Sequence, residues 1–453
     1  MEAWDYARNR LSTSLSELVQ FLSIPSVSAQ PRFKPQMIKA AGYLRDLLLE
    51  AGFPRVEIMP TPGHPIVYAE WLPAGPDAPT ILVYGHYDVQ PPEPVDLWHT
   101  PPFQPIVIGS DLFARGASDD KGQLFIYIKA VQAFKETAGA PPINIKCLFE
   151  GEEETGSPNL DPFIRQNKEL LAADVAVISD SQILSSENPA ILYGLRGISY
   201  VEVEVTGPAG DLHSGSYGGA VHNPIHALST MIASLHDADG RITIPGFYDR
   251  VQPLADEERA ELARIPFDRQ GWLEEAGVNS DWGEADYTII ERTSVRPTLD
   301  VNGIWGGYIE SGAKTVLPSK AFAKISMRLV PDQEPVNIAR MIQEHLQAIA
   351  PPTVSVEVRY LHGGSPAIVR RDSAAMSAAF RAYSDAFGNE PVFMREGGSI
   401  PVVATLQKEL GIETILMGFG LPDDNLHAPN EKIHLPNLYR GIETVIHFLN
   451  ILA

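Results

Sequence analysis

Residues 143–157 read INIKCLFEGEEETGS, an apolar run followed at once by a run of glutamates. The first seven positions are typical of a strand buried inside a sheet. Carboxylates crowded at one place repel one another, so they need protons or cations between them. A metal site would supply the cations. The stretch therefore predicts a core strand that ends at a metal site, to which the rest of the chain brings further ligands.

The composition is that of a globular protein with more than one domain. The 453 residues exceed the size of one ordinary core, and 44% of them are hydrophobic and 20% charged. The net charge of -22 argues against nucleic acid and anionic membranes, because both bind basic patches. No apolar run reaches transmembrane length, and the acidic start is unlike a signal peptide. We expect a cytoplasmic protein, in which the single cysteine, Cys147, belongs to the core.

Strand and helix patterns alternate in the first part of the chain and again near its end. Buried strands are expected at 80–84, 143–149, 175–178 and 413–418, and helices at 11–22, 122–137, 374–387 and 435–452. Such alternation predicts an α/β sheet with crossover helices. Functional side chains in such sheets gather at the carboxyl ends of the strands.

The pattern changes at about residue 192. Strands are expected at 200–206, 321–329 and 354–358, with a helix at 336–349. Residues 249–283 are charged and rich in turns, and they predict an inserted helical excursion without an assigned function. We expect a smaller α+β domain of residues 192–362, inserted into a discontinuous domain of residues 1–191 and 363–453.

Six places carry side chains suited to metal or substrate binding. They are YGHYDVQP at 84–91, RGASDDKG at 115–122, EGEEETGS at 150–157, Asp180, GDLHSG at 210–215 and DNLHAPNE at 424–431. Each alone has a plainer explanation, such as a turn histidine, aspartates at a helix N-terminus or a solvated acidic loop. Four of the six, however, follow predicted parallel strands and can converge on one edge of the sheet.

The chemistry of these side chains favours two divalent ions over one. Zn2+ takes histidine nitrogen and carboxylate oxygen, whereas a structural zinc site would usually need cysteines that this chain lacks. His86 and Asp88 are two residues apart at a strand end and can face the same side, so the carboxylate could fix the imidazole as a ligand. Neither glycine-rich nucleotide fingerprint occurs, so nucleotide binding has no support.

Taken in order, the motifs resemble those of the carnosinase and cytosolic non-specific dipeptidase family. That family belongs to the co-catalytic dinuclear metallopeptidases, with carboxypeptidase G, aminoacylase and succinyl-diaminopimelate desuccinylase. The motifs are GHYDVQP at 85, RGASDDKG at 115, EGEEETGS at 150, YGLRG at 193, DLHSGSYGG at 211, REGGSIP at 395 and NEKI at 430. The resemblance covers nearly the whole chain. It implies a mixed-sheet catalytic domain of the zinc-exopeptidase type, with an inserted α+β sandwich that serves as lid and dimerisation domain.

The resemblance also implies the metal site. Two divalent ions per subunit are expected, Zn2+ first and Mn2+ or Co2+ as alternatives. The implied ligands are His86 and Asp180 on one ion, Glu154 and His427 on the other, and Asp119 between both. Glu153 would be the general base, and Asp88 would orient His86. A cis peptide bond is implied between Asp119 and Asp120.

The resemblance places the substrate contacts mainly in the inserted domain. Arg328 would bind the terminal carboxylate, a task suited to the two-pronged guanidinium group. Thr315, Gly398 and Ser399 would make smaller contacts. His213 would stabilise the oxyanion from a partner subunit, which requires a homodimer formed through the lid domain.

The expected activity is hydrolysis of the peptide bond of dipeptides by a metal-bridged hydroxide, with Glu153 taking the proton from water. An alternative is an amidohydrolase that acts on N-acyl or N-carbamoyl amino acids with the same metals. A third interpretation is a binding protein that kept the fold, but the complete ligand set argues against it. The preferred dipeptides, the α- or β-linkage and the physiological metal stay open.

Overall fold

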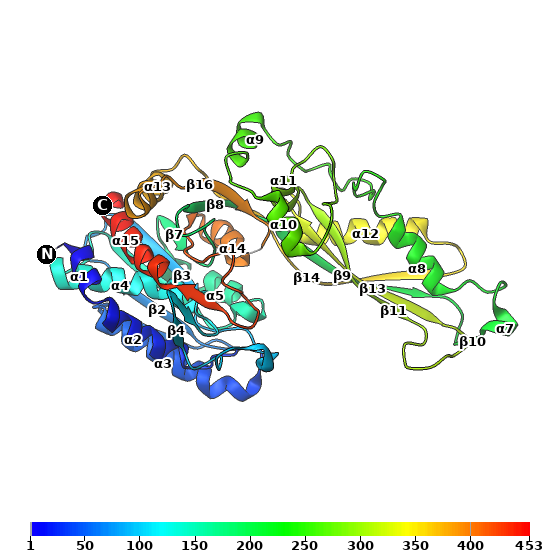
Figure 1. Ribbon diagram of the computed structural model, residues 1–453, viewed down its shortest axis with the longest axis horizontal. Coiled ribbons are helices and arrows are strands. Elements are labelled where there is room, and N and C mark those ends of the chain that lie inside the picture. Colours follow the sequence, from blue (N-terminus) through cyan, green and yellow to red (C-terminus); the bar gives the residue numbers. More distant parts are fainter. Residues whose placement is uncertain (1, 399) are drawn as a thin grey trace. The chain divides into compact units, whose positions relative to one another are not determined.

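The computed structural model describes residues 2–398 and 400–453. The chain forms two compact units, and Figure 1 labels many of their elements. The first unit comprises residues 1–193, 369–394 and 405–453, and the second comprises residues 194–368 and 395–404. None of the helices in the described part of the chain combines the length and apolarity that crossing a bilayer requires.

A mixed sheet forms the centre of the first unit. Its strands are β1 (Arg55–Met59), β2 (Ile66–Trp71), β3 (Thr80–His86), β6 (Asn144–Glu150), β7 (Val175–Ile178), β8 (Ala190–Leu195) and β17 (Glu413–Leu416). Their order in the sheet is β1-β2-β6-β3-β7-β17-β8, and the short strand β15 (Ala367–Ile368) pairs with β8 antiparallel beyond them. The four strands predicted from buried apolar runs, β3, β6, β7 and β17, pair in parallel, as expected. Their carboxyl ends therefore lie at the same edge of the sheet.

Helices and a small second sheet complete the first unit. The helices are α1 (Ala3–Asn9), α2 (Leu11–Leu22), α3 (Lys34–Glu50), α4 (Lys121–Ala138), α5 (Leu160–Gln166), α6 (Lys168–Leu171), α13 (Ala374–Phe387) and α15 (Leu435–Leu452), with short 3-10 turns η1 (Pro31–Phe33), η2 (Val95–Leu97) and η3 (Glu153–Thr155). The small sheet has the order β18 (Lys432–His434), β5 (Asp111–Phe113), β4 (Ile106–Ile108). Strand β16 (Val392–Glu396) pairs with β8, and helix α14 (Pro401–Leu410) follows it; the residues of both elements are divided between the two units.

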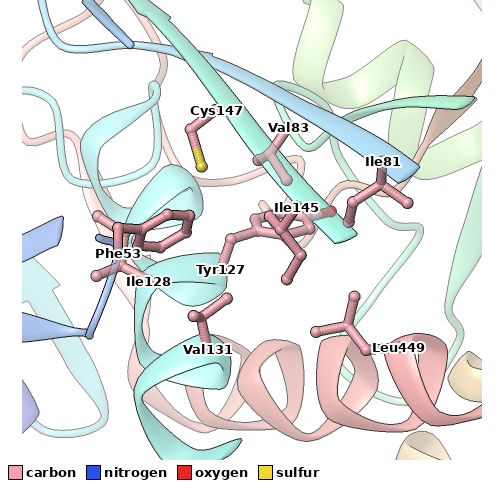
Figure 2. Close-up of a pocket in the computed structure, with 9 residues that line it drawn as sticks. All are labelled: Phe53, Ile81, Val83, Tyr127, Ile128, Val131, Ile145, Cys147 and Leu449. Atoms are coloured by element: carbon pink, nitrogen blue, oxygen red, sulfur yellow. The ribbon is translucent and has the colours of Figure 1, made fainter. Parts of the chain in front are cut away.

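Helix α4 lies in the core of the first unit. It starts directly after Asp120 and ends at Gly139, whose left-handed backbone (φ 84°) suits the absence of a side chain. Between the sheet and helices α4 and α15 lies a small apolar cavity, which Figure 2 shows with its lining residues Phe53, Ile81, Val83, Tyr127, Ile128, Val131, Ile145, Cys147 and Leu449. Cys147 is buried in this apolar surrounding, as predicted, and burial raises the pKa of its thiol.

The second unit is built on a four-stranded antiparallel sheet with the order β11-β13-β9-β14. Its strands are β9 (Gly197–Thr206), β11 (Thr298–Gly306), β13 (Lys320–Leu329) and β14 (Ser355–Gly364), and the helices α8 (Pro224–Ala233) and α12 (Pro335–Ile349) contribute to the same core. Side chains on β9 alternate between buried and half-buried, as the sequence pattern predicted. The remaining elements are β10 (Leu212–His213), α7 (Ser214–Tyr217), α9 (Asp256–Leu262), α10 (Arg269–Ala276), α11 (Ile289–Ser294), β12 (Val316–Leu317) and β15 (Ala367–Ile368).

One strand of this sheet was not predicted. β11 is an edge strand, and its side chains are mostly exposed, so no apolar alternation marks it in the sequence. The segment 249–283, predicted as a helical excursion, does contain two short helices, α9 and α10. Glu258 of α9 forms an ion pair with Arg395, the first residue of the REGGSIP motif.

Candidate functional site

The first unit brings the predicted ligands to the carboxyl edge of its sheet. β3 ends at His86, which lies opposite Glu150, the last residue of β6, across the parallel pair. β7 ends two residues before Asp180, in the next position of the sheet. The glutamates of η3 follow β6, and Asp119 lies just before α4. The topology thus explains how residues far apart in sequence meet here.

Asp119 is shared by two groups of potential ligands. One group is His86, Asp119 and Asp180, and the other is Asp119, Glu154 and His427; within each, one donor atom per residue lies within 4.8 Å of the others. Asp119 Oδ1 is 3.0 Å from His86 Nε2, and Asp119 Oδ2 is 2.9 Å from His427 Nε2. The two oxygens of one carboxylate therefore face two different imidazoles. The peptide bond after Asp119 is cis, as the resemblance implied.

The outer members of the two groups lie slightly farther from the imidazoles. Asp180 Oδ2 is 3.9 Å from His86 Nε2, and Glu154 Oε2 is 3.3 Å from His427 Nε2. His86 Nε2 is buried and, among the described residues, makes no hydrogen bond of good geometry. A metal ion bound to the neutral ring would give this nitrogen the partner that it lacks.

The electrostatics of the cluster also fit bound cations. Burial raises the pKa of Glu153 well above its usual value, and it raises the pKa of Glu154 too. The carboxylates of Asp119 and Glu154 raise the pKa of His427 to about 10. Burial opposes such a rise at His86, but Asp119 and Asp88 still raise its pKa well above the usual value. The cluster thus has an excess of negative charge, which divalent ions would neutralise, and its nitrogen and oxygen donors suit Zn2+.

Asp88 belongs to neither ligand group but contacts residues of both. Its Oδ1 lies 3.4 Å from His86 Nδ1, and its main-chain oxygen lies 3.1 Å from the same nitrogen. Its carboxylate also accepts hydrogen bonds from the backbone N–H groups of Glu153 at 3.3 Å and Glu154 at 3.1 Å. The side chain is fully buried. Asp88 therefore fixes both the ring of His86 and the turn that carries the two glutamates.

The four glutamates of the EGEEETGS motif at 150–157 differ in the residues that they contact. Glu150 Oε1 accepts hydrogen bonds from the hydroxyls of Tyr84 at 2.6 Å and Ser157 at 2.8 Å. Glu152 Oε2 accepts a hydrogen bond from Asn159 at 2.8 Å. Glu150 and Glu152 are thus bound to neutral partners, whereas Glu154 belongs to a ligand group and Glu153 stands beside it on η3.

The second unit holds the predicted substrate contacts, and it brings two of them together. His213 on β10 lies opposite Val316 on β12, and the N–H of Ser214 donates to the main-chain oxygen of Thr315 at 3.0 Å. His213 Nδ1 accepts a hydrogen bond from the N–H of Gly215 at 3.1 Å. Because Nδ1 accepts, the neutral ring carries its proton on Nε2, which can then donate. His213 is exposed.

Arg328 and Gly398 lie elsewhere in the second unit. Arg328 is a half-buried residue of β13, and burial lowers the pKa of its guanidinium group. Gly398 follows Gly397, whose main-chain oxygen accepts a hydrogen bond from Arg196 Nε at 3.3 Å. Ser399, the remaining predicted contact, lies outside the described residues. The YGLRG and NEKI motifs also carry two charged residues, Arg196 and Glu431, for which the sequence predicted no role.

Comparisons with known proteins agree with this geometry. The profile of "Peptidase family M20/M25/M40" matches residues 82–451. The Cys-Gly metallodipeptidase dug1 of Schizosaccharomyces pombe is 35% identical, and the match covers 100% of this chain and 97% of that protein. The resemblance that the motifs indicated is thereby confirmed.

Two solved structures share the fold at similar identity. Human carnosine dipeptidase 1 has a TM-score of 0.83 and 32% identity, over 99% of this chain and 98% of that chain. The M20 family metallo-carboxypeptidase Sso-CP2 of Sulfolobus solfataricus has a TM-score of 0.87 and 32% identity, over 97% and 99%. The predicted fold class, a mixed α/β sheet with a second, smaller domain, is also confirmed. The chain belongs to peptidase family M20/M25/M40 and is a metallopeptidase.

Proposed function

We propose that this protein hydrolyses the peptide bond of dipeptides with two divalent metal ions. The observation that carries the proposal is Asp119, whose two oxygens face one histidine of each ligand group. A carboxylate in this position suits a bridge between two ions. The metallodipeptidases among the relatives support the substrate class.

The proposed ligands are His86 and Asp180 for one ion, Glu154 and His427 for the other, and Asp119 for both. Zn2+ is the proposed metal, with Mn2+ or Co2+ as alternatives, because histidine nitrogen and carboxylate oxygen suit all three. When bound, such a pair lowers the pKa of water and polarises the scissile carbonyl.

The proton transfers are assigned to Glu153. Burial raises the pKa of this carboxyl, and a raised pKa suits a group that takes a proton from water and passes it to the leaving amine near neutral pH. Its neighbour Glu154 shares the turn that Asp88 holds through two hydrogen bonds. Asp88 therefore holds the proposed base, Glu153, in a fixed position relative to the proposed ligand Glu154.

The second unit is proposed as a lid that binds substrate and forms a homodimer. Arg328 would bind the terminal carboxylate, with smaller contacts from Thr315, Gly398 and Ser399, and His213 Nε2–H of a partner subunit would donate to the oxyanion. Large apolar side chains are exposed on and beside the edge strand β11: Val301, Ile304, Trp305, Tyr308 and Ile309. An exposed edge strand with this composition favours pairing with a second copy.

A substrate screen with metal reconstitution tests the proposal. The chain is stripped with a chelator and reloaded separately with Zn2+, Mn2+ and Co2+. Each form is then assayed on dipeptides such as Cys-Gly and β-Ala-His, on tripeptides, and on N-acetyl and N-carbamoyl amino acids with the same terminal residues. Faster cleavage of free dipeptides is expected. Preference for the N-acyl compounds would favour the amidohydrolase alternative, and full activity without metal would contradict the metal site.

A further inference from the structure

Glu431 is a buried carboxylate that the proposed reaction does not use. It lies in the NEKI motif, four residues after His427, and its side chain is fully buried. Oε1 accepts hydrogen bonds from the backbone N–H groups of Ser118 at 3.0 Å and Asp119 at 3.1 Å. Oε2 accepts from the N–H of Gly116 at 2.8 Å and from Arg115 Nη1 at 2.8 Å. One side chain thus binds nearly the whole loop that ends in Asp119.

These contacts exclude Glu431 itself as a metal ligand. Each of its oxygens already accepts two hydrogen bonds, which occupy the lone pairs that a cation would need. The contacts also satisfy three backbone N–H groups of an irregular, buried loop, which would otherwise lose their partners. The role of Glu431 is therefore to fix the path of the loop.

A second carboxylate, that of Asp424, also joins the loop that carries Asp119 to the loop that carries His427, and it lies on the other side of His427 in the sequence. Asp424 Oδ2 accepts hydrogen bonds from Ser118 Oγ at 2.8 Å and from the N–H of Leu421 at 2.8 Å. Asp424 and Glu431 lie three residues before and four residues after His427, and both bind Ser118. The loops that carry Asp119 and His427 are thus joined at two points.

The segment between these ties has an unusual backbone. Asn425, His427 and Asn430 have φ values of 55°, 60° and 66°, in the left-handed region that residues other than glycine seldom adopt. Such a conformation costs free energy and persists only where surrounding contacts hold it. The hydrogen bonds of Asp424 and Glu431 supply such contacts at both ends.

We propose that Glu431 is a positioning residue that sets the spacing of Asp119 and His427, with Asp424 as its counterpart. The proposal rests on the metal site proposed above. Glu431 would act on metal affinity through the backbone of Asp119 and through its own loop, without touching the ion. Replacement of groups that hold metal ligands commonly weakens binding by about 10- to 100-fold.

Metal affinity of the variant Glu431→Gln tests this. The amide oxygen can replace one carboxylate oxygen, but the amide N–H2 would face two N–H donors. The matched control is Glu284→Gln, because Glu284 of the second unit is also buried and is held by Arg296 at 2.6 and 2.8 Å. Zn2+ is titrated into both metal-free variants against a chromogenic chelator, and hydrogen exchange of residues 115–120 and 424–431 is measured before metal is added.

We expect Glu431→Gln to bind Zn2+ about 10- to 100-fold more weakly than wild type and to exchange faster in both loops. Glu284→Gln should keep wild-type affinity even if its Tm falls equally. Wild-type affinity in folded Glu431→Gln would overturn the proposal. If that variant does not fold, Glu431→Asp decides it, because the shorter carboxylate keeps the charge but cannot reach all four donors. Several-fold weaker binding supports the proposal, and unchanged binding overturns it. A wild-type protein that binds no metal would instead refute the proposed function.

Discussion

The carboxylate of Asp88 accepts a hydrogen bond from the backbone N–H of Glu154 at 3.1 Å. The same carboxylate lies 3.4 Å from His86 Nδ1, so it connects a proposed ligand of one ion to a proposed ligand of the other. A single buried side chain thus contacts both the end of β3 and the turn that follows β6.

Replacement of Asp88 by asparagine should therefore disturb both ligand groups. The asparagine amide can accept from only one of the two N–H groups and cannot balance the charge of the His86 ring. We expect metal affinity and kcat to fall by about 10- to 100-fold. Metal titration and steady-state kinetics of Asp88→Asn check this, and wild-type values for both would show that the contact is dispensable.

Glu153→Gln should separate proton transfer from metal binding. The amide keeps the size of the side chain but cannot take a proton, so kcat should fall by at least about 100-fold while both metals stay bound. Glu152→Gln is the matched control, because its side chain contacts Asn159 instead of the ligand groups. Elemental analysis and kcat are measured for both. Ordinary turnover in Glu153→Gln would place the base elsewhere.

Mixed dimers test whether His213 acts across subunits. His213→Ala and Glu153→Gln should each be nearly inactive alone, since each lacks one proposed catalytic group at every site. In a heterodimer, one site would combine an intact Glu153 with an intact His213 from its partner. We expect activity to return on mixing with subunit exchange. Stable heterodimers without activity would place His213 in the site of its own chain.

Glu396 should make stability depend on pH. Burial raises the pKa of this carboxyl from its usual 4.5 to about 7, so the folded protein binds the proton more tightly than the unfolded chain does. Its stabilising effect is complete below about pH 4.5 and is lost as the pH rises through about 7. Between pH 5 and pH 7.5 the free energy of unfolding of Glu396→Gln should rise by about 2 kcal/mol relative to that of wild type. Thermal denaturation at both pH values measures this, with exposed Glu390→Gln as the control. An equal Tm difference at the two pH values would contradict it.

Cys147 should be inert in the folded protein. It is buried in the apolar core, and burial raises the pKa of its thiol, so little thiolate forms at neutral pH. A chromogenic disulfide reagent should detect no thiol in the native protein and one per chain in strong denaturant. Rapid reaction without denaturant would mean that the core around β6 opens readily.

The strands that carry the site could be predicted because local patterns mark them. The apolar runs of β3, β6, β7 and β17 need no knowledge of the partner strand, and their parallel pairing followed from the helices between them. β11 could not be predicted, because an exposed edge strand has no apolar alternation. The ligand roles of His86, Asp119 and His427 came from the motifs, and they stay predictions until metal is measured.

The contacts of Glu431 had no signal in the sequence at all. Its four hydrogen bonds join residues more than 300 positions apart, and nothing near residue 431 indicates which loop it binds. In the sequence, a glutamate whose carboxylate accepts hydrogen bonds from backbone N–H groups cannot be told apart from an exposed glutamate. Only the folded backbone shows that it is buried and what it holds.

The strand order of the first unit also bears on how the chain is made. β17 lies between β7 and β8 in the sheet, yet a ribosome synthesises it more than 200 residues after both. Until residues 413–416 emerge, β7 and β8 lack the strand that joins them, and their apolar edges are open to wrong pairing. The edges of β7 and β8 that pair with β17 therefore stay unpaired while more than 200 further residues are synthesised. The proposed set of metal ligands is complete only when the segment with His427 has left the ribosome.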